Sequence, residues 1–214
     1  MRVNLLFVQG GKFLAALLAV SVGIVLLARL GAEPNVPNRA EAILPMLDRL
    51  ETVKTARGFT QEAVPDADIK RILLAGINAP SGHNRQPWHF TVVTDSALLD
   101  EIDTAAGKPK TRLSLAGSPL AIIISADDTS AYAVFDCGTA ADRMATAAFA
   151  LGYGTKIVAT PASVIAEKYQ EKLGIDEIYR PIAVLLIGVE NPDADAVTAP
   201  TTRSAFDEKV NFVR

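Results

Sequence analysis

Polar side chains suited to holding a small ligand are concentrated in one stretch of twelve residues, APSGHNRQPWHF at positions 79–90. Both histidines of the chain and its only tryptophan lie there. Ser81, Asn84 and Gln86 add a hydroxyl and two amides, which donate and accept hydrogen bonds, and Gly82 leaves its backbone N–H accessible. Such a loop can hold the polar edge of a ligand. An ordinary helix-to-strand connection, with the amides bonded to local backbone and the tryptophan in the core, accounts for the same residues equally well.

Composition disfavours metal and disulfide chemistry. One cysteine, Cys137, and two histidines, His83 and His89, are too few for the usual zinc sites, and a single thiol forms no internal disulfide. Cys137 lies in an alanine-rich helical pattern and is predicted to be a buried, inert thiol. The histidines have no carboxylate partner at a spacing typical of acid–base catalysis, so we assign no catalytic residue. The acidic residues of the segment 100–103 are interpreted as a solvated helix face.

Length and charge narrow the classes of function. The chain has 214 residues, half of them apolar, which suits one well-packed domain with an additional segment. It carries 21 basic and 24 acidic residues, for a net charge of −3. A nucleic-acid partner is not expected, because phosphate backbones bind strongly basic surfaces. We expect a small-molecule ligand instead.

The first 32 residues form a separate segment. Between Lys12 and Arg29 lie sixteen apolar or small residues without a charge, FLAALLAVSVGIVLLA. This length falls between a signal-peptide core and a spanning helix, so residues 1–32 are predicted to be a membrane anchor or signal segment. We favour one retained hydrophobic helix that enters the membrane through residues 13–32; a buried helix of the domain is the alternative. The basic start favours an extracytoplasmic domain, and residues 33–38 are interpreted as a linker.

Apolar patterns predict a domain over 39–214 in which helices and strands interleave without a strict βαβ rhythm. Runs with helical spacing predict helices, and β-branched apolar runs predict strands. The fold class is therefore α+β, with a sheet sandwiched by helices. Helices are expected at 39–51, from 65 or 66 to a point before the proline at position 80, and at 98–107, 131–151 and 164–175. Strands are expected at 89–95, 119–127 and 180–190.

Two of these helices carry more specific expectations. The helix that begins at 65 or 66 must end before the proline at position 80. The helix at 131–151 is rich in alanine and glycine, which allows another helix to pack closely against it. The buried stripe of the first of these helices is predicted to consist of Ile69, Ile72, Leu73 and Ile77.

A family resemblance extends these inferences. The run APSGHNRQPWHFTVV resembles the AP-S-x-x-N-x-Q-P-W-x-F signature of the FMN-dependent nitroreductase family. Further similar segments follow the family order over roughly 45–210: VKTARGFTQEAVPDADIKRILLAGINAPS, FDCGTAADRMATAAFALGYGT, RPIAVLLIGVE and TTRSAFDEKV. The resemblance implies a nitroreductase-like three-layer sandwich, with a mostly antiparallel central sheet flanked by helices. It also implies a homodimer with FMN at the subunit interface.

The resemblance also implies which residues contact FMN. Arg57 matches the basic residue near the flavin N1–C2=O edge, where a cation stabilises the reduced ring. Where the family has a first arginine this chain has Val53, which leaves the phosphate to Lys54, Arg203 or a residue of the partner chain. Thr55 takes the place of a serine on the phosphate side. The remaining matched positions are Pro80, Ser81, Gly82, Asn84 and Gln86 in the loop, Ala159 and Thr160 beside the ring, and Arg112 as a loosely aligned second cation.

The implied activity is that of a flavoprotein oxidoreductase which passes hydride or electrons from reduced FMN to a nitroaromatic or a quinone. NAD(P)H is the expected donor if the domain is cytoplasmic, and a quinol or redox partner if it is not. Two alternatives stay open. One is a reductive dehalogenase similar to the iodotyrosine deiodinase branch, and the other is a non-catalytic, flavin-binding or structural subunit of a membrane complex.

Overall fold

The computed structural model describes residues 47, 50–51, 54–107, 114–127, 129–197 and 202–214. The chain divides into two compact units, Met1–Val53 and Lys54–Arg214. In the first unit the described residues, 47, 50 and 51, are helical, and the rest of the helix predicted at 39–51 lies outside the described residues.

The second unit is built on one four-stranded sheet. Its strands are β1 (Trp88–Val93), β2 (Leu120–Asp127), β3 (Gly154–Val158) and β4 (Tyr179–Gly188). They lie in the order β1-β2-β4-β3, and every neighbouring pair is antiparallel, as predicted. Three of the four strands follow from the sequence patterns. β3 was missed, because its five residues include the charged Lys156 and form no continuous apolar run.

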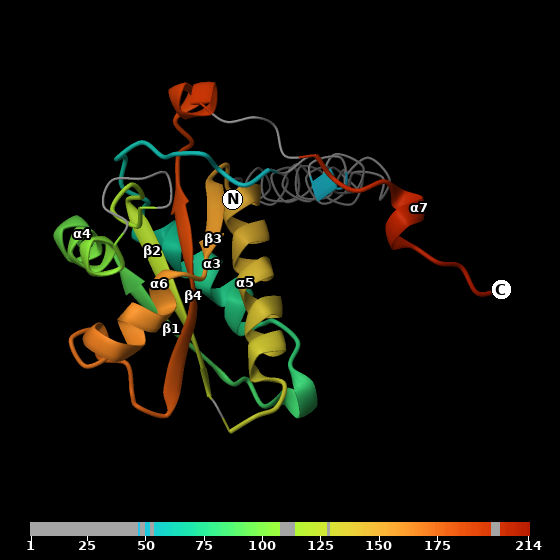
Figure 1. Cartoon of the computed structure of the whole chain (residues 1–214), viewed down its shortest axis with the longest axis horizontal. Helices are drawn as coiled ribbons and strands as arrows, with labels where there is room; N and C mark the ends of the chain where they lie inside the picture. The colour runs from blue at the N-terminus through green and yellow to red at the C-terminus, as the bar shows by residue number, and fades with distance from the viewer. Residues whose placement is uncertain (1–46, 48–49, 52–53, 108–113, 128, 198–201) are drawn as a thin grey trace, which may run out of the picture. The chain divides into compact units, whose positions relative to one another are not determined.

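Helices cover both faces of the sheet (Figure 1). On one face α3 (Asp66–Ile77) and α5 (Ala133–Ala150) pack against Ile122 and Ile124 of β2. On the other face α4 (Ser96–Ala105) and α6 (Pro161–Val164) pack with the alternate β2 residues, Ala121 and Ile123. Successive strand residues point to opposite faces, so β2 is buried on both sides. The predicted α+β sandwich of three layers is confirmed.

The helices α3 and α5 contact each other closely, as the small residues of α5 predict. Ala140, Ala148 and Met144 of α5 are fully buried. A Cβ atom on Gly76 would lie 2.7 Å from Cγ of Met144, so the glycine lets the two backbones approach. The helix α3 ends at Ile77, before Pro80, as expected. The prediction that Ile77 is buried was wrong: its side chain is 47% exposed, because the buried side of α3 carries Ile69, Ile72 and Gly76, and Ile77 lies off that side.

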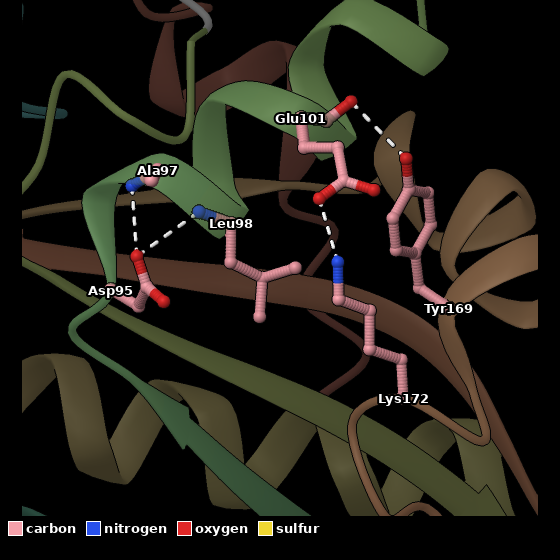
Figure 2. Close-up of polar contacts among 6 residues, drawn as sticks. All are labelled: Asp95, Ala97, Leu98, Glu101, Tyr169 and Lys172. Atoms are coloured by element: carbon pink, nitrogen blue, oxygen red, sulfur yellow. Dashed lines mark hydrogen bonds and ion pairs between the residues drawn. The ribbon is translucent and has the colours of Figure 1, made fainter.

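The helix α4 is held at its start and along its side (Figure 2). At its N-cap, Oδ1 of Asp95 accepts hydrogen bonds from the backbone N–H groups of Ala97 and Leu98, at 2.9 and 3.1 Å. The Tyr169 hydroxyl donates to the Glu101 carbonyl oxygen at 3.3 Å. Nζ of Lys172 lies 2.7 Å from the Glu101 carboxylate. This last pair is half-exposed and adds little stability, so the cap and the tyrosine are the stronger links.

Asp103 of α4 corrects the interpretation of segment 100–103 as a solvated face. Its side chain is 1% exposed. The carboxylate accepts hydrogen bonds from the Ser114 hydroxyl and from the backbone N–H groups of Leu115 and Ala116, the latter two at 3.0 and 3.1 Å. A carboxylate with three donors is stable in the interior, where an unbonded one is costly. Asp103 therefore fixes the chain that leads into β2.

The predicted membrane segment, 13–32, and the linker, 33–38, lie outside the described residues and stay predictions. Within the described ranges, no helix combines the length and the apolar character needed to cross a bilayer.

Replacing Asp95 with alanine removes the acceptor for two N–H groups at the start of α4. We expect the free energy of unfolding to fall by about 1 kcal/mol, the usual effect of losing an N-cap side chain. Urea denaturation followed by circular dichroism measures it. Asp100→Ala, an exposed position on the same helix, is the matched control and should change stability by less than about 0.5 kcal/mol. Equal losses in the two variants would contradict the capping role.

Candidate functional site

The loop that joins α3 to β1 has an unusual backbone. His83, Asn84 and Gln86 have φ values of 51°, 55° and 49°, in the left-handed region that side chains with a Cβ rarely adopt. Each such residue costs roughly 1–2 kcal/mol, less for asparagine. Strain of this kind persists only where surrounding contacts hold it, and it is often found at ligand sites.

Bonds within the loop hold part of this conformation. The backbone N–H of Gln86 donates to the Ser81 hydroxyl oxygen at 3.0 Å. The Gln86 side-chain amide donates to Oδ1 of Asn84 at 3.2 Å. The side chains of Pro80, Asn84 and Gln86 are exposed, whereas Ser81 and Gly82 are half-buried. The structure thus places all five predicted loop residues together, with the two amides at the surface.

Three side chains of α5 hold the first half of the loop, beside which the helix begins (Figure 1). The Gly82 N–H donates to both carboxylate oxygens of Asp136, each at 3.1 Å. The Thr139 hydroxyl lies 2.9 Å from the Pro80 carbonyl oxygen, and Nη1 of Arg143 donates to the Asn78 carbonyl oxygen at 3.2 Å. Sequence reasoning missed these three residues; their spacing of three and four along one helix was the available signal.

The second group of predicted residues lies at 54–57 and 159–160. The backbone N–H of Ala56 donates to the Thr155 carbonyl oxygen at 2.9 Å, and that of Thr60 donates to the Val189 carbonyl oxygen at 2.8 Å. These bonds fix Arg57, half-buried, beside the start of β3 and the end of β4; Lys54 and Thr55 are exposed.

Ala159 and Thr160 follow β3 and line a cavity of about 220 Å³ on the face of the sheet that α4 covers. Ala56 belongs to the buried cluster of the same face. The buried Asp103 also reaches this cavity. The other lining residues are Ala106, Ile157, Val158 and Pro161.

One protomer does not bring the two groups together. The loop leads into Trp88, which pairs with Ala126 at the end of β2. The segment around Arg57 contacts residues 188–190, at the opposite end of the sheet, because Leu120 at the start of β2 pairs with Ile187. Among the described residues, no hydrogen bond or ion pair joins the two groups. Arg203 lies in the exposed stretch 202–214, and Arg112 is outside the described residues.

The cations predicted to contact an anionic ligand have no competing carboxylate. Lys54, Arg57 and Arg203 make no ion pair with any described residue. Unpaired cations in one group and amide donors in the other are donor types that fit a phosphate and the negative edge of a reduced flavin.

The other residues singled out in the sequence have structural roles. Trp88 is 8% exposed and lies in the core. Cys137 is fully buried, and its thiol lies 3.8 and 3.9 Å from the carbonyl oxygens of Ser125 and Pro87. Burial, with a smaller contribution from the Asp136 charge, raises the pKa of the Cys137 thiol to about 12. The prediction of a buried thiol is confirmed. No cluster of metal-ligating side chains occurs among the described residues.

Comparison with known proteins assigns the family. The sequence pattern of the nitroreductase family matches residues 51–113 and 106–189. A curated NADH dehydrogenase/NAD(P)H nitroreductase of Archaeoglobus fulgidus, a name given to it as putative, is 31% identical over 155 residues, 70% of this chain and 87% of that protein. The chain belongs to the nitroreductase family.

A solved structure agrees with this assignment. An FMN-dependent nitroreductase of Clostridium difficile R20291 superposes with a TM-score of 0.67, at 26% identity, over 80% of this chain and all of that one. Two further solved nitroreductases of the same fold hold bound FMN. The iodotyrosine deiodinase of Haliscomenobacter hydrossis is 40% identical, but over 55 residues, 26% of this chain and 25% of that protein.

The raised pKa of Cys137 predicts a thiol that reacts slowly. At pH 8 we expect iodoacetamide to alkylate the folded protein at least about 100 times more slowly than the guanidinium-unfolded chain, because the thiolate is the reactive form. Since the folded thiol keeps its proton where the unfolded one loses it, its contribution to stability falls as pH rises from about 9 to about 12. Mass spectrometry measures the alkylated fraction, because the chain has a single cysteine. Equal rates in both states would show that the thiol is accessible.

Proposed function

We propose that the protein is an FMN-dependent oxidoreductase that reduces a small electron-poor acceptor, a nitroaromatic or a quinone. Family membership supports the class, and the observation that carries the proposal is the strained polar loop of 80–86, the family's flavin-binding position. FMN, when bound, supplies the hydride or electron transfer. The chain itself therefore needs no acid or base residue, in agreement with the absence of an assigned one.

The protein's own contribution is to bind and orient. Arg57 would stabilise negative charge at one edge of the ring, and the amides of Asn84 and Gln86 would bond its polar edge. Lys54, Thr55 and Arg203 would hold the phosphate, with Arg112 as a further cation. The exposed ends of Ala159 and Thr160 would line the ring beside the cavity.

The site requires two copies of the chain. The loop and Arg57 lie at opposite ends of the sheet; the loop bonds to α5, and the segment of Arg57 bonds to the start of β3 and the end of β4. A single flavin contacted by both groups must therefore take one group from each protomer. A homodimer with FMN at the interface, as the resemblance implies, satisfies this geometry. The exposed apolar side chains of Tyr132, Val134 and Phe135 at the start of α5, at 63%, 58% and 73% exposure, agree with a surface that a second copy covers.

The side of the membrane on which the domain lies would decide its electron donor. A membrane anchor at 13–32 with an extracytoplasmic domain would require a quinol or redox partner, whereas a cytoplasmic domain would use NAD(P)H, as the name of the Archaeoglobus fulgidus relative suggests. Reductive dehalogenation is the second candidate function, because of the short deiodinase match. A non-catalytic flavin-binding or structural subunit is the third.

The function is tested on the full chain purified in mild detergent. We expect bound FMN in a ratio near one per protomer, bleaching of the flavin absorbance by NADH or a quinol under anaerobic conditions, and recovery of the absorbance when a nitroaromatic or quinone is added. Recovery with an iodinated tyrosine alone favours the dehalogenase. A flavin that no donor reduces supports the binding subunit, and a protein that binds no FMN overturns the proposal.

Mixed dimers test the shared site. Arg57→Ala and Asn84→Gly should each weaken FMN binding by roughly 10- to 100-fold, the effect of one hydrogen bond to a charged or buried polar group. Glycine keeps the left-handed backbone at 84 without strain. In a dimer of one Arg57→Ala copy and one Asn84→Gly copy, one site has both native residues, so we expect tight binding of FMN at half the native stoichiometry.

The control is a dimer of two differently tagged Arg57→Ala copies, which should bind weakly at both sites. If each protomer binds flavin with its own residues only, the mixed dimer carries one altered residue in each site. It would then bind no better than its parents, and the two-chain site would be wrong.

A further inference from the structure

The chain from 78 to 82 lies along one stripe of α5. Alternate residues of this segment each present a backbone group to the helix: the Asn78 carbonyl, the Pro80 carbonyl and the Gly82 N–H. The three partners, Arg143, Thr139 and Asp136, are spaced by four and three residues and so share one face of the helix. Side chains of α5 thus bond the backbone of this segment at every second residue, as the backbone of a neighbouring strand does in a sheet.

Asp136 is the buried member of this stripe. Its side chain is 3% exposed, whereas Arg143 is exposed. The carboxylate makes no ion pair with a described residue, and both of its oxygens accept from the Gly82 N–H at 3.1 Å. A buried carboxylate is unfavourable unless hydrogen bonds compensate for lost water. Packing of the core does not require a carboxylate at this position. We therefore attribute the buried position of Asp136 to its bond with the Gly82 N–H.

Gly82 is where the strained part of the loop begins. His83 and Asn84 follow directly with positive φ, and Gln86 is bonded back to Ser81, the neighbour of Gly82. Fixing the Gly82 N–H fixes the point from which the left-handed residues extend. A loop that is ordered before the ligand arrives binds more tightly, because the ordering entropy is not lost on binding.

We propose that Asp136 is a positioning residue for the flavin loop, assisted by Thr139 and Arg143, and that α5 orders this loop before FMN binds. The inference rests on the proposed FMN site. Asp136 acts through Gly82 and the loop backbone, without contact to the flavin. The conservative change to asparagine keeps one oxygen acceptor for the Gly82 N–H, whereas alanine removes both.

The experiment compares Asp136→Ala, Asp136→Asn and Arg143→Ala in the full chain in detergent, with Asp142→Ala as the matched control. Asp142 is exposed on the same helix and makes no bond with a described residue. FMN affinity of the apoprotein is measured by quenching of flavin fluorescence, at a temperature where every variant is folded. Hydrogen–deuterium exchange of peptides covering 79–86 is measured without FMN.

We expect Asp136→Ala to raise the Kd for FMN about 10- to 100-fold, the effect of a hydrogen bond to a charged acceptor, and to accelerate exchange at 79–86. Asp136→Asn should recover most of both losses, Arg143→Ala should weaken binding a few-fold, and Asp142→Ala should match the native protein. Recovery by asparagine distinguishes positioning from a general loss of stability, which the alanine variant alone does not.

The outcomes distinguish a failure of the positioning role from a failure of the proposed function. If the native chain binds FMN and Asp136→Ala binds it equally well with unchanged exchange, the positioning role is overturned while the proposed function stands. If Asp136→Ala and Asp142→Ala lose affinity equally, the role is also overturned. If the native chain binds no FMN, the proposed function fails, and the exchange measurement still decides whether Asp136 orders the loop.

Discussion

Burial of the central strands on both faces is the constraint on which the rest of the structure depends. β2 is buried almost along its whole length, and the second half of β4 is buried beside it. A sheet whose middle is apolar on both sides requires helices on both sides, and it leaves no polar surface in its middle for a ligand. Ligand contacts must therefore come from the connections at its ends. In the proposed site they come from two connections at opposite ends of the sheet, so one flavin would need two copies of the chain.

Sequence patterns predicted the elements that apolar residues define. β1, β2, β4 and the helices α3, α4 and α5 each have a continuous or periodic apolar signal, and the structure places them within a few residues of the predicted ranges. β3 was missed because an edge strand pairs on one side and does not need a continuous apolar run. The polar Thr155 and the charged Lys156 interrupt its apolar pattern. At Ile77 the apolar pattern predicted burial that the structure does not show, because the buried side of α3 is formed by Ile69, Ile72 and Gly76.

The sequence predicts which residues of the loop form the candidate site, but not their backbone conformation or their bonding partners. The loop residues were recognised together, yet the sequence does not indicate that residues 83, 84 and 86 have a left-handed backbone. The helical spacing of Asp136, Thr139 and Arg143 shows a shared face but does not indicate that Asp136 bonds to Gly82, 54 residues away. Asp103 shows the same difficulty. A carboxylate on a helix is solvated unless another segment supplies donors. For Asp103 two of the three donors are backbone N–H groups, which every non-proline residue has and no motif records. The partners of a buried acidic residue are thus a property of the fold.

The buried carboxylates of Asp103 and Asp136 link connecting segments of the chain to the packed core. Asp103 and Asp136 are both on helices that pack against the central strands, and both bond to the backbone of the adjoining connection. A hydrogen bond from an amide to a charged acceptor is about twice as strong as one to a neutral acceptor. Each carboxylate therefore holds its connection to the core more strongly than a neutral side chain would. Because α5 also packs on α3 and on the sheet, displacement of Gly82 would require either a broken charged bond or movement of the core. On the proposal made above, these bonds stabilise the strained loop, and its polar groups would hold one orientation before any ligand is present.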